Sequence, residues 1–397
     1  MKVSFVCPNS YLDPAVFGQA SFPFPPRLYN RAVGARSVDS AFANARLADE
    51  LGFDWVSVSE HHYAPGLMAP NALVLAGALT QVVKRARIAL LGPIVSVNNP
   101  VRVAEEIALL DLMSGGRIVV FLIRGTPNEF NTYYVRPADT RERAQEAIKL
   151  IEHALTEPEP FGWEGRYFKF PTVSVWPRPT QVPHPPLYSS GNSPESCLFA
   201  AQNRHGLAMS FIPPKLVTQA VQLYKTEAAK AGWEPRPDQI LYRSFIHIGE
   251  SEEEARAQHE ERAARVRPRP EYAAAPRGLG PLSWLESIGV SERDALTGNY
   301  REGDAQEDGA ARGGEGFGLG SLQFEGTPDQ IIERIRAFQR LTGVGVLDLI
   351  FSPTAGPEAI QRRMRLFARE VLPHIRELED GRPPAAAAEP ATSAAPT

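Results

Sequence analysis

The chain alternates short β-branched apolar runs with longer stretches of helical periodicity, and this alternation constrains its fold more than any other feature. The first strand is expected at 2–6, a helix at 38–52 and a second strand at 54–59. The remaining strands are expected at 88–95, 117–123, 187–189, 207–211, 240–248 and 346–351. The remaining helices are expected at 71–84, 101–113, 141–155, 194–204, 215–231, 252–266, 328–341 and 357–376.

Eight strands that alternate with helices predict an α/β protein with a TIM (β/α)8 barrel. The strands are nearly continuous apolar runs, as expected for parallel strands that are buried on both faces. A doubly wound open sheet is the main alternative, but the eight strands and the lack of a GxGxxG motif after the first strand disfavour it. In such a barrel the functional groups lie at the carboxyl ends of the strands, so candidate site residues are sought there.

Two excursions and a tail interrupt the alternation. Residues 157–186, after strand four, hold many prolines and aromatic pairs typical of a hairpin, and about residues 267–322, after strand seven, are rich in Pro, Gly and Ala. The second excursion is too long for an ordinary connection, so we interpret it as an active-site lid or as disorder. Residues 378–397 form an Ala/Pro-rich tail that we expect to be disordered. The expected organisation is one barrel domain over 1–377 with insertions after strands 4 and 7.

Composition argues against several classes of protein. Lys and Arg number 42 against 46 Asp and Glu, and the formal net charge of −4 argues against a nucleic-acid partner. The two cysteines, Cys7 and Cys197, lack the spacing of a disulfide scaffold or a thiolate zinc site. No apolar run approaches the roughly 20 residues of a membrane helix, and Pro8 comes before a signal-like segment has formed. We therefore expect a cytoplasmic protein with no membrane association.

Three consecutive groups capable of proton chemistry follow strand two: Glu60, His61 and His62. Histidine titrates near neutral pH, which suits general acid and base work. The alternative is that one of these side chains bonds a neighbouring loop while another points to solvent. A metal site is a further alternative, since His and carboxylate are good ligands. We expect no metal, because successive residues at a strand end point in different directions and no second cluster completes a coordination shell.

Anion-binding groups are expected at two further strand ends. Arg124 with Gly125 follows strand four, where an arginine can anchor a phosphate or carboxylate; a structural salt bridge is the alternative. Asn192 and Ser193 follow strand five and lead into a helix opened by Pro194, whose N-terminal N–H groups favour an anion. Ordinary capping by Ser193 is the alternative there, and capping and phosphate binding can coexist. Two such places in one barrel favour a phosphorylated cofactor.

Several spaced motifs resemble the bacterial luciferase-like flavin-dependent monooxygenase family. They are Glu60-His61-His62, the run from Gly92 to Gly125, FKFP at 168–171 and RLFAREVLPHI at 365–375. The resemblance covers about residues 1–377 in order. It implies a barrel that binds FMN, takes reduced flavin from a separate reductase and uses O2 to form a flavin C4a-hydroperoxide, which oxygenates a small apolar substrate such as an aldehyde or ketone. It also implies a homodimer, formed through helices near strands two and three.

The resemblance also assigns roles to individual residues. His61 matches the catalytic histidine of the Glu-His-His motif, in which Glu60 precedes it. Arg124 matches the arginine at the flavin phosphate. Asn192 and Ser193 fall where the family has a Glu-Ser pair that holds the same phosphate, and Asn192 departs from that pattern.

Further positions match the flavin pocket of the family. Ser210, followed by Phe211, matches a Ser-Trp pair that lines the flavin. The family has an unusual cis peptide bond at the end of strand three, where Gly92 and Pro93 align, so we predict that the bond between these two residues is cis. Ile123 stands where true luciferases carry a reactive cysteine, which argues against light emission.

Two alternatives for the function remain open. A deazaflavin (F420)-dependent oxidoreductase of the same superfamily would transfer hydride without O2, although the Glu-His-His motif favours FMN. A non-catalytic flavin-binding subunit is the second alternative, and the retained His61 and Arg124 disfavour it.

Overall fold

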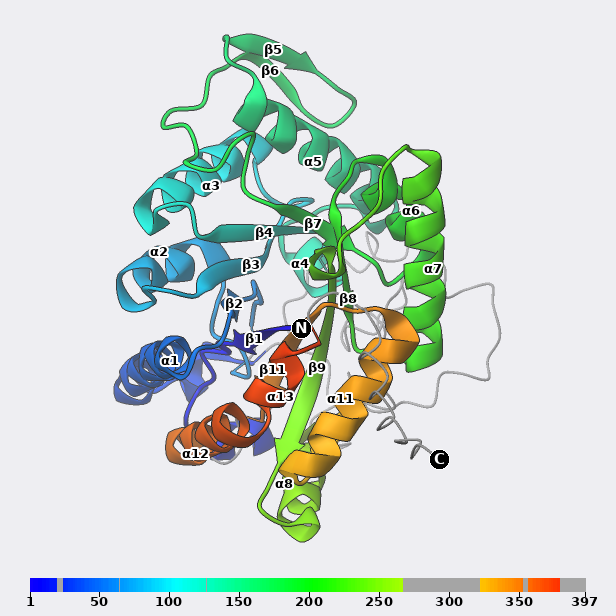
Figure 1. The fold of residues 1–397 in the computed structure, drawn as a ribbon. Coiled ribbons are helices and arrows are strands. Elements are labelled where there is room, and N and C mark those ends of the chain that lie inside the picture. The colour runs from blue at the N-terminus through cyan, green and yellow to red at the C-terminus, as the bar shows by residue number, and fades with distance from the viewer. Residues whose placement is uncertain (20–23, 64, 126, 267–321, 353–355, 379–397) are drawn as a thin grey trace, which may run out of the picture.

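Eight parallel strands close into a barrel, as the alternation predicts. The computed structural model describes residues 1–19, 24–63, 65–125, 127–266, 322–352 and 356–378. Strands pair in the order β9, β11, β1, β2, β3, β4, β7 and β8, and β8 pairs back to β9, so the sheet closes (Figure 1). The predicted TIM barrel is confirmed, and the alternative prediction of an open, doubly wound sheet is wrong. The barrel strands are β1 Lys2–Val6, β2 Trp55–Val58, β3 Arg87–Ile94, β4 Ile118–Ile123, β7 Leu187–Ser190, β8 Gly206–Ser210, β9 Ile240–Ile248 and β11 Val346–Phe351.

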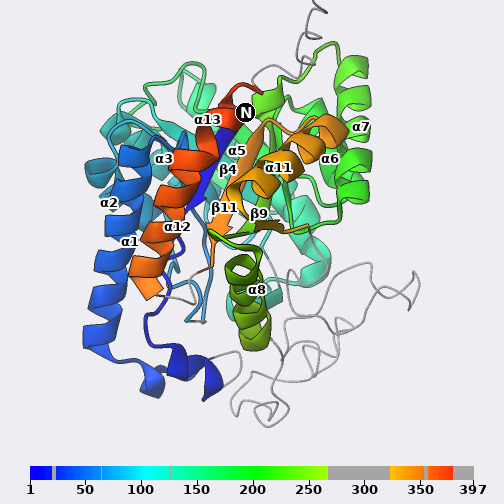
Figure 2. The ribbon, with the colours of Figure 1, turned by 60° about the horizontal axis from the view of Figure 1, so that its bottom comes forward.

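Helices cover the outer face of the barrel (Figure 2). The helices that the structure describes are α1 Arg31–Leu51, α2 Ala72–Val82, α3 Pro100–Ser114, α4 Pro127–Thr132, α5 Thr140–Thr156, α6 Pro194–Gln202, α7 Pro214–Lys230, α8 Glu252–Val266, α11 Pro328–Thr342, α12 Gly356–Glu370 and α13 Leu372–Arg376. Short 3-10 helices are η1 Pro14–Gly18, η2 Pro26–Leu28, η3 Pro137–Asp139 and η4 Pro237–Gln239. Figure 2 shows α8 at the end of the barrel opposite the N-terminus. This end, where the strands finish, is called the barrel mouth below.

Two helix boundaries differ from the prediction for identifiable reasons. Helix α1 begins seven residues before the expected start at residue 38, because the Asn30 side chain accepts hydrogen bonds from the N–H groups of Ala32 and Val33 and caps the helix there. The helix expected at 357–376 is two helices, α12 and α13, separated at Val371. Pro373, at the start of α13, has no N–H to continue the hydrogen bonding of α12.

The excursion after strand four contains a hairpin, as its aromatic pairs predict. Strands β5 Phe161–Glu164 and β6 Lys169–Val173 pair antiparallel outside the barrel. A short strand not expected from the sequence, β10 Phe324–Gly326, pairs in parallel with β9. The predicted lid at about 267–322 lies outside the described residues except for Leu322, and the predicted tail at 378–397 lies outside them except for Leu378.

The barrel interior changes from apolar to polar toward the mouth. Inward-facing residues recur at every second position of a strand. The apolar layer holds Trp55, Leu241 and Val346, together with the rings of Phe121 and Tyr188, which stack with their centroids 4.4 Å apart. Two residues further along the same strands, Ser57, Arg243 and Asp348 form a polar layer. The polar layer lies nearer the mouth, where chemistry is expected.

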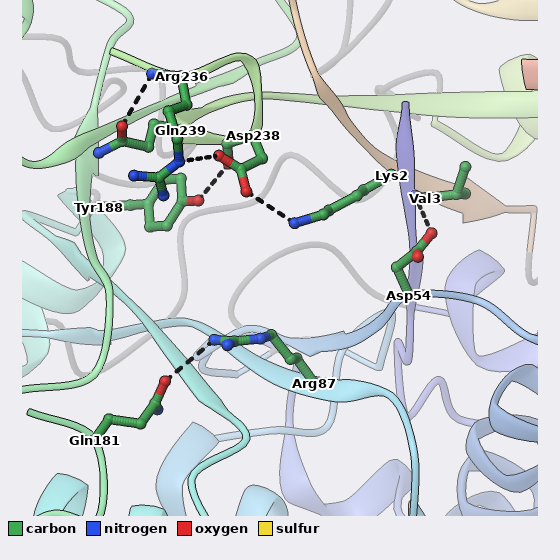
Figure 3. A network of polar contacts seen from close by, with 9 residues as sticks. All are labelled: Lys2, Val3, Asp54, Arg87, Gln181, Tyr188, Arg236, Asp238 and Gln239. Atoms are coloured by element: carbon green, nitrogen blue, oxygen red, sulfur yellow. Dashed lines mark hydrogen bonds and ion pairs between the residues drawn. The ribbon is translucent and has the colours of Figure 1, made fainter. Parts of the chain in front are cut away.

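Polar contacts close the opposite end of the barrel (Figure 3). Asp238, in the turn before β9, accepts hydrogen bonds from Lys2 Nζ at 2.8 Å and Arg236 Nε at 3.1 Å. The Tyr188 hydroxyl donates to the Asp238 carbonyl oxygen at 2.6 Å, and burial raises the pKa of this phenol. These contacts tie β1, β7 and β9 together away from the mouth.

Among the helices that the structure describes, none combines the length and apolar character needed to cross a membrane.

Candidate active site

The Glu60 to His62 segment follows β2 at the barrel mouth, and its side chains lie in different surroundings. Glu60 and His62 are both buried, and Glu60 Oε1 lies 3.4 Å from His62 Nε2. Asn98 Nδ2 lies 3.5 Å from the same carboxylate oxygen and donates to the Ile94 carbonyl at 2.9 Å. The His61 side chain is partly exposed, and its backbone N–H donates to the Ala69 carbonyl at 2.9 Å. The alternative that one of these side chains bonds its neighbours while another faces solvent stays open, because His62 is buried beside Glu60 and His61 is partly exposed.

A charged network fills the polar layer at the base of this segment. Arg243 Nε donates to Asp348 Oδ2 at 2.6 Å, and Asp348 Oδ1 accepts from Ser57 Oγ at 2.7 Å. Arg243 Nη1 donates to Ser59 Oγ at 2.8 Å, and its Nη2 lies 3.4 Å from Ser57 Oγ. All four side chains are buried. The network therefore joins β2, β9 and β11 immediately before Glu60 and His61.

This environment keeps His61 uncharged at neutral pH. Burial, and to a smaller extent the charges of Arg243 and His62, together lower the pKa of His61 to about 4. A neutral imidazole carries one nitrogen that accepts a proton and one that donates. His61 can therefore serve as a proton acceptor at the mouth near pH 7.

The start of α6 already accommodates a negative charge. Ser193 is its N-cap residue, and the Ser193 hydroxyl accepts from the Ser196 N–H at 3.4 Å. The Glu195 carboxylate accepts hydrogen bonds from its own backbone N–H and from Ser193, and these bonds lower its pKa. Arg141 Nη1, on α5, lies 3.5 Å from Glu195 Oε2. Because hydroxyl, N–H and guanidinium groups here surround an exposed carboxylate, the same donors fit a phosphate.

Asn192 and Ser210 join the ends of β7 and β8. The Asn192 amide donates to the Ser210 carbonyl at 3.1 Å and accepts from the Ser210 N–H at 3.0 Å. Phe211 follows with a left-handed backbone, φ 56°, and its ring stacks on Phe245 with centroids 5.3 Å apart. The structure thus brings the predicted residues Asn192, Ser193 and Ser210 together at the mouth.

Arg124 and Gly125 leave β4 at a crowded place. The Arg124 carbonyl accepts from Ser96 Oγ at 2.5 Å, and the Ser96 carbonyl accepts from Arg143 Nε at 2.7 Å. Gly125 has φ +96°, and a Cβ added there would lie 2.5 Å from Ile94 Cγ2, so only glycine fits. The Arg124 side chain is partly exposed. Its backbone is fixed by the Ser96 hydrogen bond to its own carbonyl and by the close packing of Ile94 at Gly125.

The cis peptide bond lies one residue before the predicted position. The bond between Leu91 and Gly92 is cis, and the bond between Gly92 and Pro93 is trans, so the prediction of a cis Gly92–Pro93 bond is wrong. A Cβ added to Gly92 would lie 1.5 Å from the Phe121 carbonyl oxygen of β4. The pairing of β3 with β4 shifts register between Leu91 and Ile94. Gly92 is thus the residue that permits the close approach of the two strands, and Pro93 follows it.

No three His, Cys, Asp or Glu side chains among the described residues are grouped so as to hold a metal ion.

A model of luciferase-like monooxygenases matches residues 21–344. The chain belongs to the luciferase-like monooxygenase family. It is similar to the FMNH(2)-dependent dimethylsulfone monooxygenase of Pseudomonas putida, with 27% identity over 348 residues, 85% of this chain and 88% of that protein. It is also similar to the 5,10-methylenetetrahydromethanopterin reductase of Archaeoglobus fulgidus, with 26% identity over 343 residues, 83% of this chain and 94% of that protein. The crystal structure of monooxygenase RslO1 from Streptomyces bottropensis matches with a TM-score of 0.71 and 25% identity, covering 94% of this chain and 99% of that one.

This luciferase-like protein is a flavin-dependent oxygenase by its family. Sequence reasoning missed the buried pair of Arg243 and Asp348, whose arginine bonds Ser59 just before the segment that carries the candidate catalytic histidine. The sequence does indicate such a pair, because the strand sequences ILYRSFIHI and VLDLIF each contain one charged residue in an otherwise largely apolar run. A charge inside a barrel strand needs a partner, and the partner is 105 residues away in the chain.

Proposed function

We propose that this luciferase-like protein is an FMN-dependent monooxygenase, which uses O2 and reduced flavin from a separate reductase to oxygenate a small apolar substrate such as an aldehyde or ketone. The observation that carries the proposal is that an uncharged histidine and an anion-accepting helix start both lie at the mouth of one barrel. Similarity to an FMNH(2)-dependent monooxygenase supports it.

The residues at the mouth fit a flavin mononucleotide. Ser193, the N–H groups at the start of α6, and Arg141 and Arg124 would hold the phosphate. Ser210, the Asn192 amide that fixes it, and the segment around Gly92 and Pro93 would line the ring. When bound, reduced FMN supplies the electrons that activate O2.

His61 would move the proton of the reaction. Its imidazole is uncharged at neutral pH, so a ring nitrogen can take a proton from a reacting group and return it later. Glu60 is buried and lies against His62 and Asn98, so we assign it to positioning the segment that carries His61. Ser59, bonded to Arg243, holds the other end of this segment.

The proposal includes a homodimer, for which the structure offers a surface. Large apolar side chains are exposed on α2 and α3, the helices that follow β2 and β3: Val74, Leu109, Leu112 and Met113. Sedimentation should give twice the chain mass of 43.6 kDa. Leu112→Glu should yield monomers, whereas Leu216→Glu, on exposed α7, should not. A chain that sediments as a monomer at micromolar concentration would contradict the dimer.

Oxygen uptake with photoreduced FMN tests the oxygenase. With medium-chain aldehydes or cyclic ketones offered, uptake should be coupled to incorporation of label from ¹⁸O2 into the product. His61→Ala should reduce this coupled turnover by about 100-fold or more. His374→Ala is the matched control, because His374 is exposed on α13. Equal turnover by both variants would contradict the assignment of His61.

The alternatives make different predictions in the same assay. The similarity to a methylenetetrahydromethanopterin reductase supports an oxidoreductase that is not an oxygenase. An F420-dependent enzyme of this kind should oxidise or reduce substrate without O2 uptake and should bind F420 more tightly than FMN. A non-catalytic flavin-binding subunit should bind FMN and show neither reaction.

A further inference from the structure

His62 holds two half-exposed tyrosines together beside His61, although it has no part in the proton chemistry assigned to His61. The His62 ring is buried, and its Nε2 lies 3.4 Å from Glu60 Oε1. The Tyr63 ring lies against it with centroids 5.7 Å apart, and the Tyr133 ring packs edge-to-face at 5.4 Å. Tyr63 follows β2 and Tyr133 follows α4, so rings from two different mouth loops meet on one buried side chain.

The exposed tyrosines of the described part of the chain collect on the loops at the barrel mouth. They precede α1 or follow β2 and α4, and they are Tyr29, Tyr63, Tyr133 and Tyr134. Large exposed aliphatic side chains lie on the outer helices α2, α3, α7 and α11 and, in one case, on the connection from α5 to β7. Trp176, on the same connection, is an exposed aromatic residue away from the mouth. Aromatic rings therefore mark the mouth, and aliphatic groups mark the outer wall.

We propose that Tyr63 and Tyr133 bind an aromatic ring of the substrate, so that the substrate class of the proposed oxygenase is aryl aldehydes and aryl ketones rather than aliphatic ones. His62 is then a positioning residue, which acts through the two tyrosines. That the bound compound is oxygenated rests on the proposed function. That the mouth binds it does not, because binding can be measured without turnover.

The surroundings of these two tyrosines differ from those of the tyrosines that pack the core. Tyr188, Tyr224 and Tyr242 are buried, and their hydroxyls donate to backbone carbonyl oxygens. Tyr63 and Tyr133 are 44% and 46% exposed. The Tyr133 hydroxyl has no hydrogen-bond partner among the residues that the structure describes. Packing against His62 thus uses only part of each ring and leaves surface for a ligand.

An aromatic ligand gains more from exposed tyrosines than a saturated ligand of the same size. A phenyl and a cyclohexyl ring bury similar apolar areas, so the hydrophobic effect separates them little. Contact between two aromatic rings adds about 2- to 10-fold in affinity beyond area burial. Contacts with both Tyr63 and Tyr133 should therefore favour the aryl compound by roughly 10-fold.

A matched pair of ketones tests the inference on the full-length chain. Acetophenone and cyclohexyl methyl ketone differ only in the saturation of the ring. Their dissociation constants, measured by ligand-observed NMR with and without oxidised FMN, should favour acetophenone by about 10-fold. In the double variant Tyr63→Leu with Tyr133→Leu, the preference should fall to about 2-fold or less.

Three control variants separate ring contact from other effects. Trp176→Leu removes an exposed aromatic ring away from the mouth and should keep the preference. Tyr133→Phe keeps the ring and should keep it as well. His62→Leu should reduce the preference, and His62→Phe, which restores a ring between the tyrosines, should recover most of it. Equal reduction in the two His62 variants would overturn the positioning role of His62.

Three results overturn the recognition of an aromatic ring. The first is a wild type that binds both ketones equally. The second is a loss of preference in Trp176→Leu as large as in the double variant. The third is a double variant that keeps the ketone preference and loses FMN affinity in a fluorescence titration, because the tyrosines would then cover the flavin instead of the substrate.

The outcomes distinguish this inference from the proposed function. A preference for acetophenone in a chain without substrate-coupled O2 uptake removes the function and leaves the aryl-binding site in place. In an active chain, the double variant should raise the KM of acetophenone by about 10-fold and change that of cyclohexyl methyl ketone by about 2-fold or less. An active chain with equal kcat/KM for the two ketones would overturn the assigned substrate class.

Discussion

Asp348→Asn should destabilise the protein by about 3 to 5 kcal/mol, the usual cost of removing one partner of a buried ion pair. Asp348 has no solvent exposure and accepts hydrogen bonds at 2.6 Å from Arg243 and at 2.7 Å from Ser57. Asparagine keeps the shape of the side chain but leaves Arg243 as a buried cation without a counter-charge. One of the two accepting oxygens also becomes an amide nitrogen, which cannot accept a hydrogen bond.

The double variant Arg243→Met with Asp348→Leu should lie within about 1 kcal/mol of the wild type or be more stable, because neither charge remains to be desolvated. The two positions are in contact, so single-variant costs should be strongly non-additive. Urea unfolding followed by tryptophan fluorescence measures this, since Trp55 lies in the layer below the pair. Lys2→Met is the control. It breaks the ion pair with Asp238, whose side chains are 37% and 32% exposed, and should cost less than about 1 kcal/mol.

An Asp348→Asn cost as small as that of Lys2→Met, at an unchanged dependence on urea concentration, would refute the reasoning. A double variant whose cost equals the sum of the two single costs would refute it as well. Either result would mean that the pair in the barrel interior behaves like one in contact with water.

Three further predictions follow from other parts of the structure. Ser193→Ala should cost about 1 kcal/mol of stability and weaken FMN binding in a fluorescence titration. Asn71→Ala, which removes the cap of α2, should cost similar stability and leave the FMN affinity unchanged. Equal FMN affinity in the two variants would contradict a phosphate site at α6. Gly92→Ala should give little folded protein by circular dichroism, because the new Cβ would lie 1.5 Å from a backbone oxygen. Gly115→Ala is the control. Its new Cβ would meet nothing within 4 Å, but the residue has φ +68°, so this variant should fold with reduced stability. Glu152→Gln should lower the Tm at pH 7. Burial raises the pKa of Glu152, but the hydrogen bond and charge of His205 and the charge of His184 outweigh burial and hold it below its ordinary value of 4.5. The ionised group therefore stabilises the native state above about pH 4.5 and loses this effect as the pH falls through the lowered pKa. The Tm difference between Glu152→Gln and the wild type should therefore shrink in acid. A Tm difference that stays constant from pH 7 to pH 3 would show that the charge of Glu152 does not contribute.

The barrel could be predicted from the sequence because its strands are local apolar runs. The runs 2–6, 240–248 and 346–351 coincide with β1, β9 and β11 to the residue. Predicting β10 would have required knowing that it meets β9, because a three-residue strand gains its stability from that pairing rather than from its own sequence. The apolar periodicity marks the start of α1 seven residues late, because the actual start is fixed by the Asn30 cap and not by apolar residues.

The candidate site was predicted in its location but not in its electrostatics. Strand ends in a barrel meet at one mouth, so Asn192 and Ser210 could be expected near each other, and they are hydrogen-bonded. Which charge acts on His61 depends on the register of β2, β9 and β11, which no local pattern encodes. The cis bond was placed one residue late, because a proline following the glycine suggested the wrong peptide bond.

The apolar layer beneath the polar one has a consequence for how protons travel in this protein. Phe121, Leu241 and Val346 carry no group that can pass a proton on, and the Tyr188 hydroxyl is bonded to Asp238 at the far end. Proton exchange between His61 and solvent is therefore confined to the mouth. In the proposed oxygenase, proton supply to His61 and substrate access would therefore share a single route.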